Sequence, residues 1–175
     1  LAVAGNDTTR TATRAGMHLL AQNPEQRKIW QNDLEGVTAT AVDEIVRMAS
    51  PVTYMRRTVT RPLTLSGHDF EAGDRLIMFY GAANRDPRRW DQPDEFRLNR
   101  PRIQEHLSFG RGVHTCAGAP LAKLEVKALL ERFLAHTSHI GLSEEKHGTP
   151  GNRRLRYAPS YITRGLTRLY IDLAS

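Results

Sequence analysis

Residues 109–118 read Phe-Gly-Arg-Gly-Val-His-Thr-Cys-Ala-Gly and contain the only cysteine of a 175-residue chain. Apolar residues then recur at helical spacing, at Leu121, Leu124, Ala128, Leu129 and Phe133. A thiol near a helix N-terminus ionises readily, because the partial positive charge there stabilises an anion. Glycines beside the thiol let a flat ligand approach closely. Cys116 is therefore a candidate metal ligand, although a lone cysteine is more often a small buried hydrophobe.

The pattern Phe-Gly-x-Gly-x-His-x-Cys-x-Gly resembles the haem-binding signature of the cytochrome P450 family, with all six fixed positions present. The resemblance implies that Cys116 is the proximal thiolate ligand of a haem b iron. It also implies that His114 donates to a haem propionate, that Phe109 packs near the sulfur and that Gly110 belongs to the cofactor site. Ala117 replaces the leucine that the family often has there.

The N-terminal residues form an unusual start for a helix predicted over residues 2–22. The sequence Ala4-Gly5-Asn6-Asp7-Thr8-Thr9 combines a glycine with β-branched residues, which lowers helix propensity. On composition alone, an ordinary frayed helix end explains it. The segment also resembles the oxygen-activation segment of the distal P450 helix. In that comparison Ala4 and Gly5 leave room for haem and dioxygen, Thr8 hydrogen-bonds the dioxygen or holds a water, and Asp7 relays protons.

Glu44 and Arg47 are spaced i, i+3 on a predicted helix. Such a pair is commonly a surface contact worth roughly 0.2–0.5 kcal/mol. Its place between the distal segment and the cysteine loop resembles the Glu-x-x-Arg motif of the family, in which both side chains meet a second arginine from a later loop. Arg100 is the candidate for that arginine. Because buried charges must be paired, such a triad would lock the loop to the helix.

The implied fold class is mainly α with small β-sheets, as in the C-terminal portion of the cytochrome P450 fold. Its expected parts in order are the distal helix, the Glu-x-x-Arg helix, β-hairpins, a meander, the cysteine loop, a proximal helix and a late β-hairpin. Helices are predicted at residues 2–22, 24–32, 38–49 and from the cysteine loop to about 135, with Gly36 separating the second from the third. Strands are predicted within 53–80 and at 154–157 and 166–173, with irregular chain over 86–105 and a loop over 143–153.

Two further sets of site residues follow from the resemblance. Arg57 falls where the family places an arginine that holds a haem propionate, and the arginine fork suits a carboxylate. The neighbouring Arg56 leaves the assignment to one of the two arginines open, and a pair of surface arginines on an edge strand is the alternative without a haem. The residues expected to line the substrate pocket are Val52, Thr53, Tyr161 and Ile162.

Composition limits the partners. The net charge of +6 comes from arginines interleaved with acidic residues, which argues against nucleic-acid binding. One cysteine excludes an internal disulfide framework and favours a reducing, cytoplasmic location, and no apolar run is long enough for a membrane span. Arg111, Lys123 and Lys127 lie near the cysteine loop and could attract an acidic electron donor of the ferredoxin or flavodoxin type.

The resemblance covers nearly the whole chain and implies that residues 1–175 are the C-terminal part of a single soluble, bacterial-type P450 domain whose N-terminal part is absent. The implied activity is a monooxygenase that uses O2 and two electrons to oxidise a hydrophobic organic substrate. Two alternatives stay open at this point. One is a non-catalytic or degenerate haem-binding protein, and the other is a basic interaction module without haem.

Overall fold

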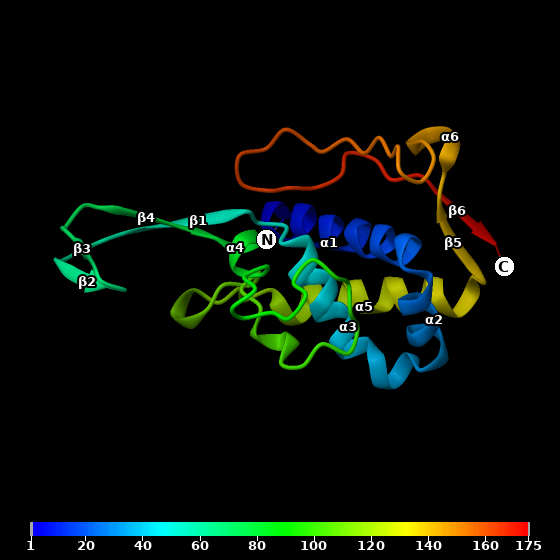
Figure 1. Cartoon of the computed structure of the whole chain (residues 1–175), viewed down its shortest axis with the longest axis horizontal. Coiled ribbons are helices and arrows are strands. Elements are labelled where there is room, and N and C mark those ends of the chain that lie inside the picture. Colours follow the sequence, from blue (N-terminus) through cyan, green and yellow to red (C-terminus); the bar gives the residue numbers. More distant parts are fainter. Residues whose placement is uncertain (1, 175) are drawn as a thin grey trace.

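The computed structural model describes residues 2–174, and side chains from Ala4 onward. Long helices form one body, and three small two-stranded sheets lie at its edges (Figure 1). The elements in chain order are α1 (Ala2–Gln22), α2 (Pro24–Asn32), α3 (Leu34–Ala49), β1 (Tyr54–Thr58), β2 (Leu63–Leu65), β3 (His68–Phe70), β4 (Arg75–Phe79), α4 (Tyr80–Ala83), the 3-10 helices η1 (Ile103–Glu105) and η2 (Gly112–His114), α5 (Ala119–His136), β5 (His139–Leu142), α6 (Glu144–His147) and β6 (Ile171–Ala174). The predicted class, mainly α with small sheets, is confirmed.

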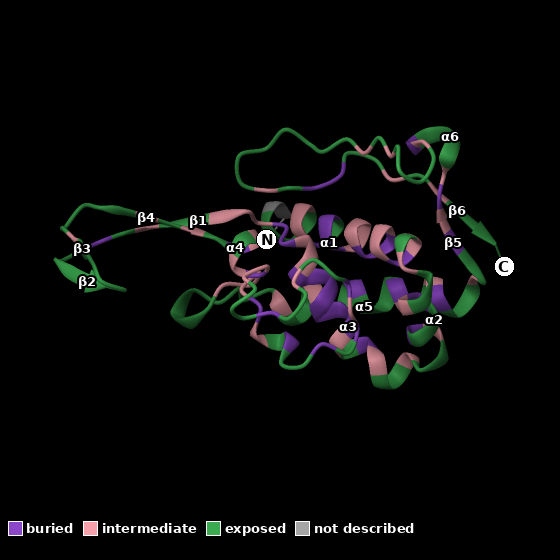
Figure 2. Ribbon diagram, in the orientation of Figure 1, coloured by how far each residue is buried: buried purple, intermediate pink, exposed green. Residues whose placement is uncertain are grey.

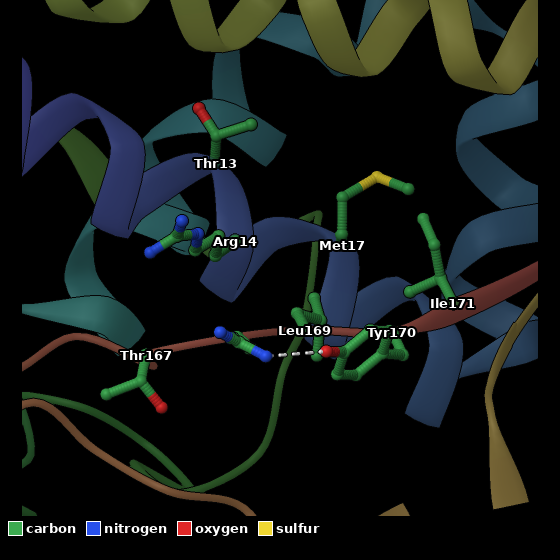
Figure 3. A pocket seen from close by; sticks show the side chains of 8 residues that line it. Thr13, Arg14, Met17, Thr167, Leu169, Tyr170 and Ile171 are labelled. Carbon is green, nitrogen blue, oxygen red and sulfur yellow. Dashed lines mark hydrogen bonds between the residues drawn. The ribbon is translucent and has the colours of Figure 1, made fainter. Parts of the chain in front are cut away.

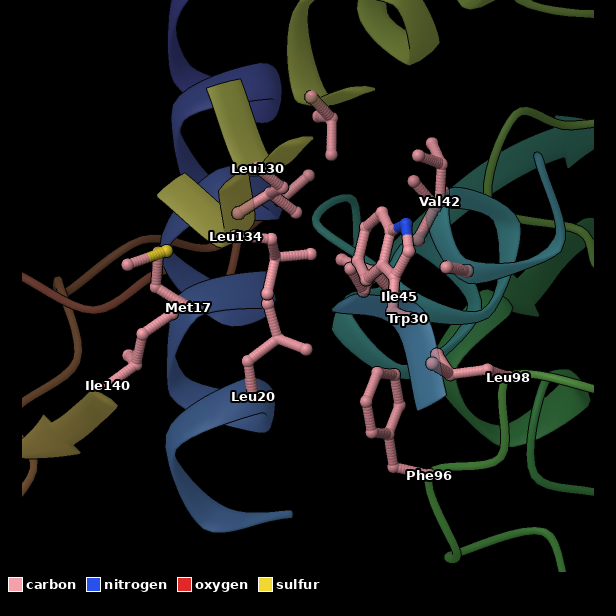
Figure 4. Close-up of a cluster of buried hydrophobic side chains, with 14 residues drawn as sticks. Met17, Leu20, Trp30, Val42, Ile45, Phe96, Leu98, Leu130, Leu134 and Ile140 are labelled. Atoms are coloured by element: carbon pink, nitrogen blue, oxygen red, sulfur yellow. The ribbon is translucent and has the colours of Figure 1, made fainter. Parts of the chain in front are cut away.

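The core lies where α1, α2, α3 and α5 meet. Figure 2 shows buried positions along these helices, whereas the arm formed by β1 to β4 is largely exposed. The large apolar side chains of this core with no exposed surface are those of Leu20, Trp30, Ile45, Leu130 and Ile140 (Figure 4). Burial of this kind contributes about 1.5–3 kcal/mol for each large apolar side chain. The packed helices therefore fix the loops that leave them.

Helix α5 has two apolar faces, and the structure buries only one of them. Val126, Leu130 and Leu134 pack into the core. Leu121, Leu124 and Leu129, which the spacing grouped on one face, are 59%, 59% and 48% exposed. Periodicity therefore identified the helix but did not identify its core face.

The predicted boundary before α3 is wrong. Asp33, not Gly36, marks the start, because the Asp33 carboxylate accepts a hydrogen bond of 2.8 Å from the Gly36 amide and caps the helix. The helix therefore begins at Leu34 and Gly36 lies in its first turn. The end agrees better with expectation, since Ser50 adopts a left-handed conformation just before Pro51.

The early strands lie within the predicted range of residues 53–80. Strands β1 and β4 pair antiparallel with Tyr54 opposite Phe79, and β2 and β3 form a short hairpin at the tip of the arm. The late strands differ from prediction. Residues 154–157 form no strand, and only an isolated bridge joins Tyr157 to Leu166. Strand β6 is shorter than predicted and pairs with β5, which had no distinct sequence signal.

The C-terminal segment between α6 and β6 runs along α1 (Figure 1). The Arg14 guanidinium donates a 2.9 Å hydrogen bond to the Leu166 carbonyl. A Cβ on Gly165 would overlap the Thr11 hydroxyl, so glycine permits this close approach. This packing places residues 165–166 against the middle of α1. The predicted loop over 143–153 also contains the short helix α6.

Candidate functional site

The cysteine loop closes on itself through backbone hydrogen bonds. The Cys116 amide donates to the Phe109 carbonyl over 2.8 Å, and Gly110 and Gly112 take left-handed φ angles of 69° and 74°. Glycine suits these angles because it has no Cβ penalty there. Helix α5 begins three residues after the cysteine, at Ala119, and its 18 residues give the thiol a helix N-terminus. The loop thus presents an exposed thiol in front of a long helix.

The residues around this thiol fit a haem. Among residues 2–174 no group of three or more His, Cys, Asp or Glu side chains could hold a metal ion. A lone thiolate is a sufficient protein ligand when the metal brings its other ligands, as haem iron does. A Cβ built on Gly112 in the loop, or on Gly5 at the start of α1, meets no atom within 4 Å, so both backbones border open space. Ala4 and Gly5 are also exposed.

Asp7 and Thr8 are held in different ways. The Thr8 hydroxyl donates its one proton to the Ala4 carbonyl over 2.7 Å. Any further hydrogen bond to this hydroxyl must therefore be one that its oxygen accepts. The Asp7 carboxylate accepts from the Arg10 guanidinium at 2.8 Å and from the Thr163 hydroxyl at 2.9 Å. The bonds from Arg10 and Thr163 hold the pKa of Asp7 below its ordinary value. Asp7 is therefore an anchored carboxylate in this structure.

Thr163 also joins Asp7 to the segments expected to line the substrate pocket. The Thr53 amide and hydroxyl both donate to the Ile162 carbonyl, at 2.7 and 2.8 Å. Val52 pairs with Thr163 in an isolated antiparallel bridge, and Tyr161 beside them is 92% exposed. The two predicted lining segments therefore lie side by side. Thr163 was not singled out in the sequence, because its contact with Asp7 spans 156 residues.

The structure brings Glu44, Arg47 and Arg100 together. All three side chains are buried, and the Glu44 and Arg47 side chains have no exposed surface. Arg47 donates from Nε to Glu44 Oε2 at 2.7 Å and from Nη2 to Oε1 at 2.9 Å, while Arg100 Nε lies 3.2 Å from Oε2. Both arginines also donate to backbone carbonyls of residues 91–95. The cluster therefore fastens the meander to α3.

Arg57 and His114 show no such convergence. Arg57 lies in β1, and its guanidinium donates to the Arg56 carbonyl at 3.0 Å. His114 lies exposed in η2. Neither position tests a contact with a haem propionate, so both remain predictions as cofactor contacts.

A cavity in the described part of the chain lies apart from these residues. It has a volume of about 330 Å³ between α1 and residues 167–171, and it is lined by residues such as Thr13, Arg14 and Met17 (Figure 3). Two of its lining residues on the same segment are bonded to each other, since the Arg168 guanidinium donates to the Tyr170 hydroxyl at 3.2 Å. None of its lining residues is a predicted site residue, so this cavity is not the candidate site. Among the described helices, none is long and apolar enough to cross a membrane.

The helical body, the thiol loop and the buried Glu–Arg cluster agree with the fold class that the resemblance implies. The family model for cytochrome P450 matches residues 1–151. Because that match covers most of the chain, the protein belongs to the cytochrome P450 family.

Curated relatives and a solved structure agree with this. The methyl-branched lipid omega-hydroxylase of Mycobacterium tuberculosis is 43% identical over 146 residues, which are 83% of this chain and 34% of the relative. The steroid C26-monooxygenase of Rhodococcus jostii is 38% identical over 157 residues, or 89% of this chain and 31% of the relative. The substrate-free Mycobacterium marinum cytochrome P450 CYP150A6 superposes with a TM-score of 0.92 at 40% identity, over 98% of this chain and 42% of that one. The chain thus spans about a third of the length of the curated relatives.

Proposed function

We propose that residues 1–175 are the C-terminal part of a single cytochrome P450 domain in a cytoplasmic haem-thiolate monooxygenase. The full-length protein would use O2 and two electrons to oxidise a hydrophobic organic substrate. The observation that carries the proposal is the exposed Cys116 thiol on the P450 signature loop in front of α5. The names of the two relatives, a lipid omega-hydroxylase and a steroid monooxygenase, support an apolar substrate.

In this proposal Cys116 holds the haem iron, and the bound haem supplies the oxygen-activating chemistry. Phe109 and Gly110 shape the loop around the sulfur, and Ala4 and Gly5 leave space on the facing helix. His114 and Arg57 donate to the haem propionates.

The proton chemistry falls to Asp7 and Thr8. Since the Thr8 hydroxyl already donates to Ala4, its oxygen serves as an acceptor that holds a water in the site. Asp7 collects a proton on a carboxylate oxygen and passes it toward that water. Each of its two oxygens accepts one hydrogen bond, from Arg10 and from Thr163, and keeps a second lone pair that can take the proton. Substrate lies against Val52, Thr53, Tyr161 and Ile162.

An electron donor of the ferredoxin or flavodoxin type would dock near the cysteine loop. Arg111 and Lys127 are exposed there and can meet acidic groups. Lys123 is a poorer candidate than its sequence position indicated, because its ammonium lies 2.5 Å from Asp43 Oδ1. We expect charge reversal at Arg111 and Lys127 to slow association more than charge reversal at Lys123, measured as rates at low and high salt.

The direct test uses the full-length protein reduced under carbon monoxide. We expect a thiolate-type Soret band in the wild type and its loss in Cys116→Ala. Turnover with an electron-transfer system, compared between wild type and Asp7→Asn, then separates an enzyme from a non-catalytic haem protein. A wild type that binds no haem, or a Cys116→Ala variant that keeps the thiolate band, would overturn the proposal.

A further inference from the structure

A second buried charge cluster lies beside the cysteine loop and is distinct from the Glu44 triad. His106 directly precedes the loop segment, Asp43 lies on α3 and Lys123 lies on α5. The side chains of His106 and Asp43 are 2% and 11% exposed, and His106 Nε2 lies 3.3 Å from Asp43 Oδ1. Lys123 Nζ lies 2.5 Å from the same oxygen. One carboxylate therefore joins two helices to the entrance of the loop.

The partners of His106 assign its tautomer. Nδ1 accepts a hydrogen bond of 3.2 Å from the Ser108 amide, so this nitrogen carries no proton. The proton must then lie on Nε2, which donates to Asp43. Burial alone raises the pKa of Asp43, but the hydrogen bonds from His106 and Lys123 outweigh it and hold that pKa below its ordinary value. His106 thus links a charged carboxylate to a backbone amide of the loop.

The same contacts fix Phe109. The His106 ring lies 5.6 Å from the Phe109 ring, centroid to centroid, and the Lys123 ammonium lies 5.6 Å from the Phe109 centroid. The Ser108 hydroxyl donates to the Val46 carbonyl of α3 at 2.8 Å. The Phe109 carbonyl in turn accepts a hydrogen bond from the Cys116 amide. An unbroken chain of contacts therefore leads from Asp43 to the backbone of the cysteine.

We propose that His106 is a positioning residue for the Cys116 thiolate, acting through the Ser108 amide and the Phe109 carbonyl while Asp43 and Lys123 hold its ring. The inference rests on the proposed role of Cys116 as haem ligand. Groups that orient a metal ligand from behind typically change affinity or activity by 10–100-fold when removed, because the ligand loses its fixed geometry.

Two variants of full-length, haem-loaded protein separate the two ring nitrogens. His106→Asn keeps an acceptor near the position of Nδ1 but cannot reach Asp43. His106→Gln keeps a donor near the position of Nε2 but leaves the Ser108 amide without its acceptor. We expect the Cys116 amide to exchange with solvent about tenfold faster in His106→Gln, as loss of one buried hydrogen bond predicts, and about as in wild type in His106→Asn. The thiolate-type carbon monoxide band should weaken in His106→Gln and stay close to the wild-type band in His106→Asn.

His147 provides a matched control far from the loop. It is buried, and its Nε2 accepts a 2.8 Å hydrogen bond from the Tyr170 amide. His147→Asn removes an equivalent imidazole–amide bond, so it should lower the melting temperature and leave Cys116 exchange and the carbonyl band unchanged.

Three results would overturn the inference. The first is that both His106 variants match the wild type in Cys116 amide exchange and in the carbon monoxide band. The second is that both variants change these two readouts equally, in proportion to their loss of stability. The third is that His147→Asn changes the two readouts as much as His106→Gln does. Amide exchange at Cys116 is read without haem chemistry. A wild-type protein without the thiolate band would contradict the proposed function. A normal wild-type band, with His106 variants that change neither the band nor Cys116 amide exchange, would contradict this inference alone.

Discussion

The most direct energetic prediction concerns Glu44→Gln. Glu44 Oε2 accepts from Arg47 Nε at 2.7 Å and Arg100 Nε at 3.2 Å, and Oε1 accepts from Arg47 Nη2 at 2.9 Å and the Arg97 amide at 3.1 Å. Glutamine has the same shape but places an NH2 donor where one of these acceptors stood. The substitution therefore removes a buried negative charge and places the glutamine NH2 donor against N–H donors of the neighbouring arginines.

The magnitude follows from burial. Removing one partner of a buried ion pair costs about 3–5 kcal/mol, because the remaining charge is left uncompensated. Arg47 keeps carbonyl partners at Asn84 and Pro93, at 2.6 and 2.8 Å, so we expect the lower end, about 3 kcal/mol. That is a large part of the roughly 5–15 kcal/mol that stabilises a typical domain.

The assay is urea unfolding of the full-length protein, with the midpoint and the slope fitted separately. Glu105→Gln is the matched control, since Glu105 also joins two arginines, Arg89 and Arg102, but at the surface. We expect little change there, because solvent screens surface ion pairs. If Glu44→Gln shifts the midpoint no more than Glu105→Gln at equal slope, the reasoning from buried charge is refuted.

Three other predictions concern the two ends of the site and the isolated chain. Thr163→Val should raise the pKa of Asp7 toward its ordinary value, because one lowering hydrogen bond is lost. A lowered aspartate pKa stabilises the fold at pH values above the unfolded pKa, and this stabilisation is lost as the pH falls through the folded pKa. The variant should therefore lose less stability on acidification than the wild type. Carbon-13 titration of Asp7 checks the pKa, with Thr163→Ser as the control that keeps the hydroxyl. Gly110→Ala should lower the melting temperature more than Gly112→Ala. Both substitutions force alanine into a left-handed φ at a penalty of about 1–2 kcal/mol, but only at Gly110 does the new Cβ lie close to a loop carbonyl, at 3.3 Å. Equal decreases in melting temperature would contradict this prediction. The 175-residue segment expressed alone should aggregate, because it exposes several large apolar side chains, and a monomeric, cooperatively melting protein in light scattering and calorimetry would show otherwise.

The sequence by itself determined the features that depend on residues close in the chain. Glycines at fixed spacing around Cys116 predicted its loop, and the helix predicted over residues 2–22 ends at Gln22, as α1 does in the structure. The helix predicted over residues 38–49 ends where α3 ends, at Ala49. Turn chemistry and helical periodicity are local, so a single sequence carries them. The family also followed from the spacing of the loop residues.

Only the tertiary structure decided which distant residues meet. Helix α5 offers two apolar faces, and packing against α1 and α3 selects the one with Leu130 rather than the one with Leu129. The bond between Asp7 and Thr163 spans 156 residues, and that between Asp43 and His106 spans 63. No local pattern marks such partners, because a hydroxyl or imidazole gains its role from the groups that folding brings to it. Long-range packing thus turned a recognisable thiol loop into a loop anchored on α3 and α5.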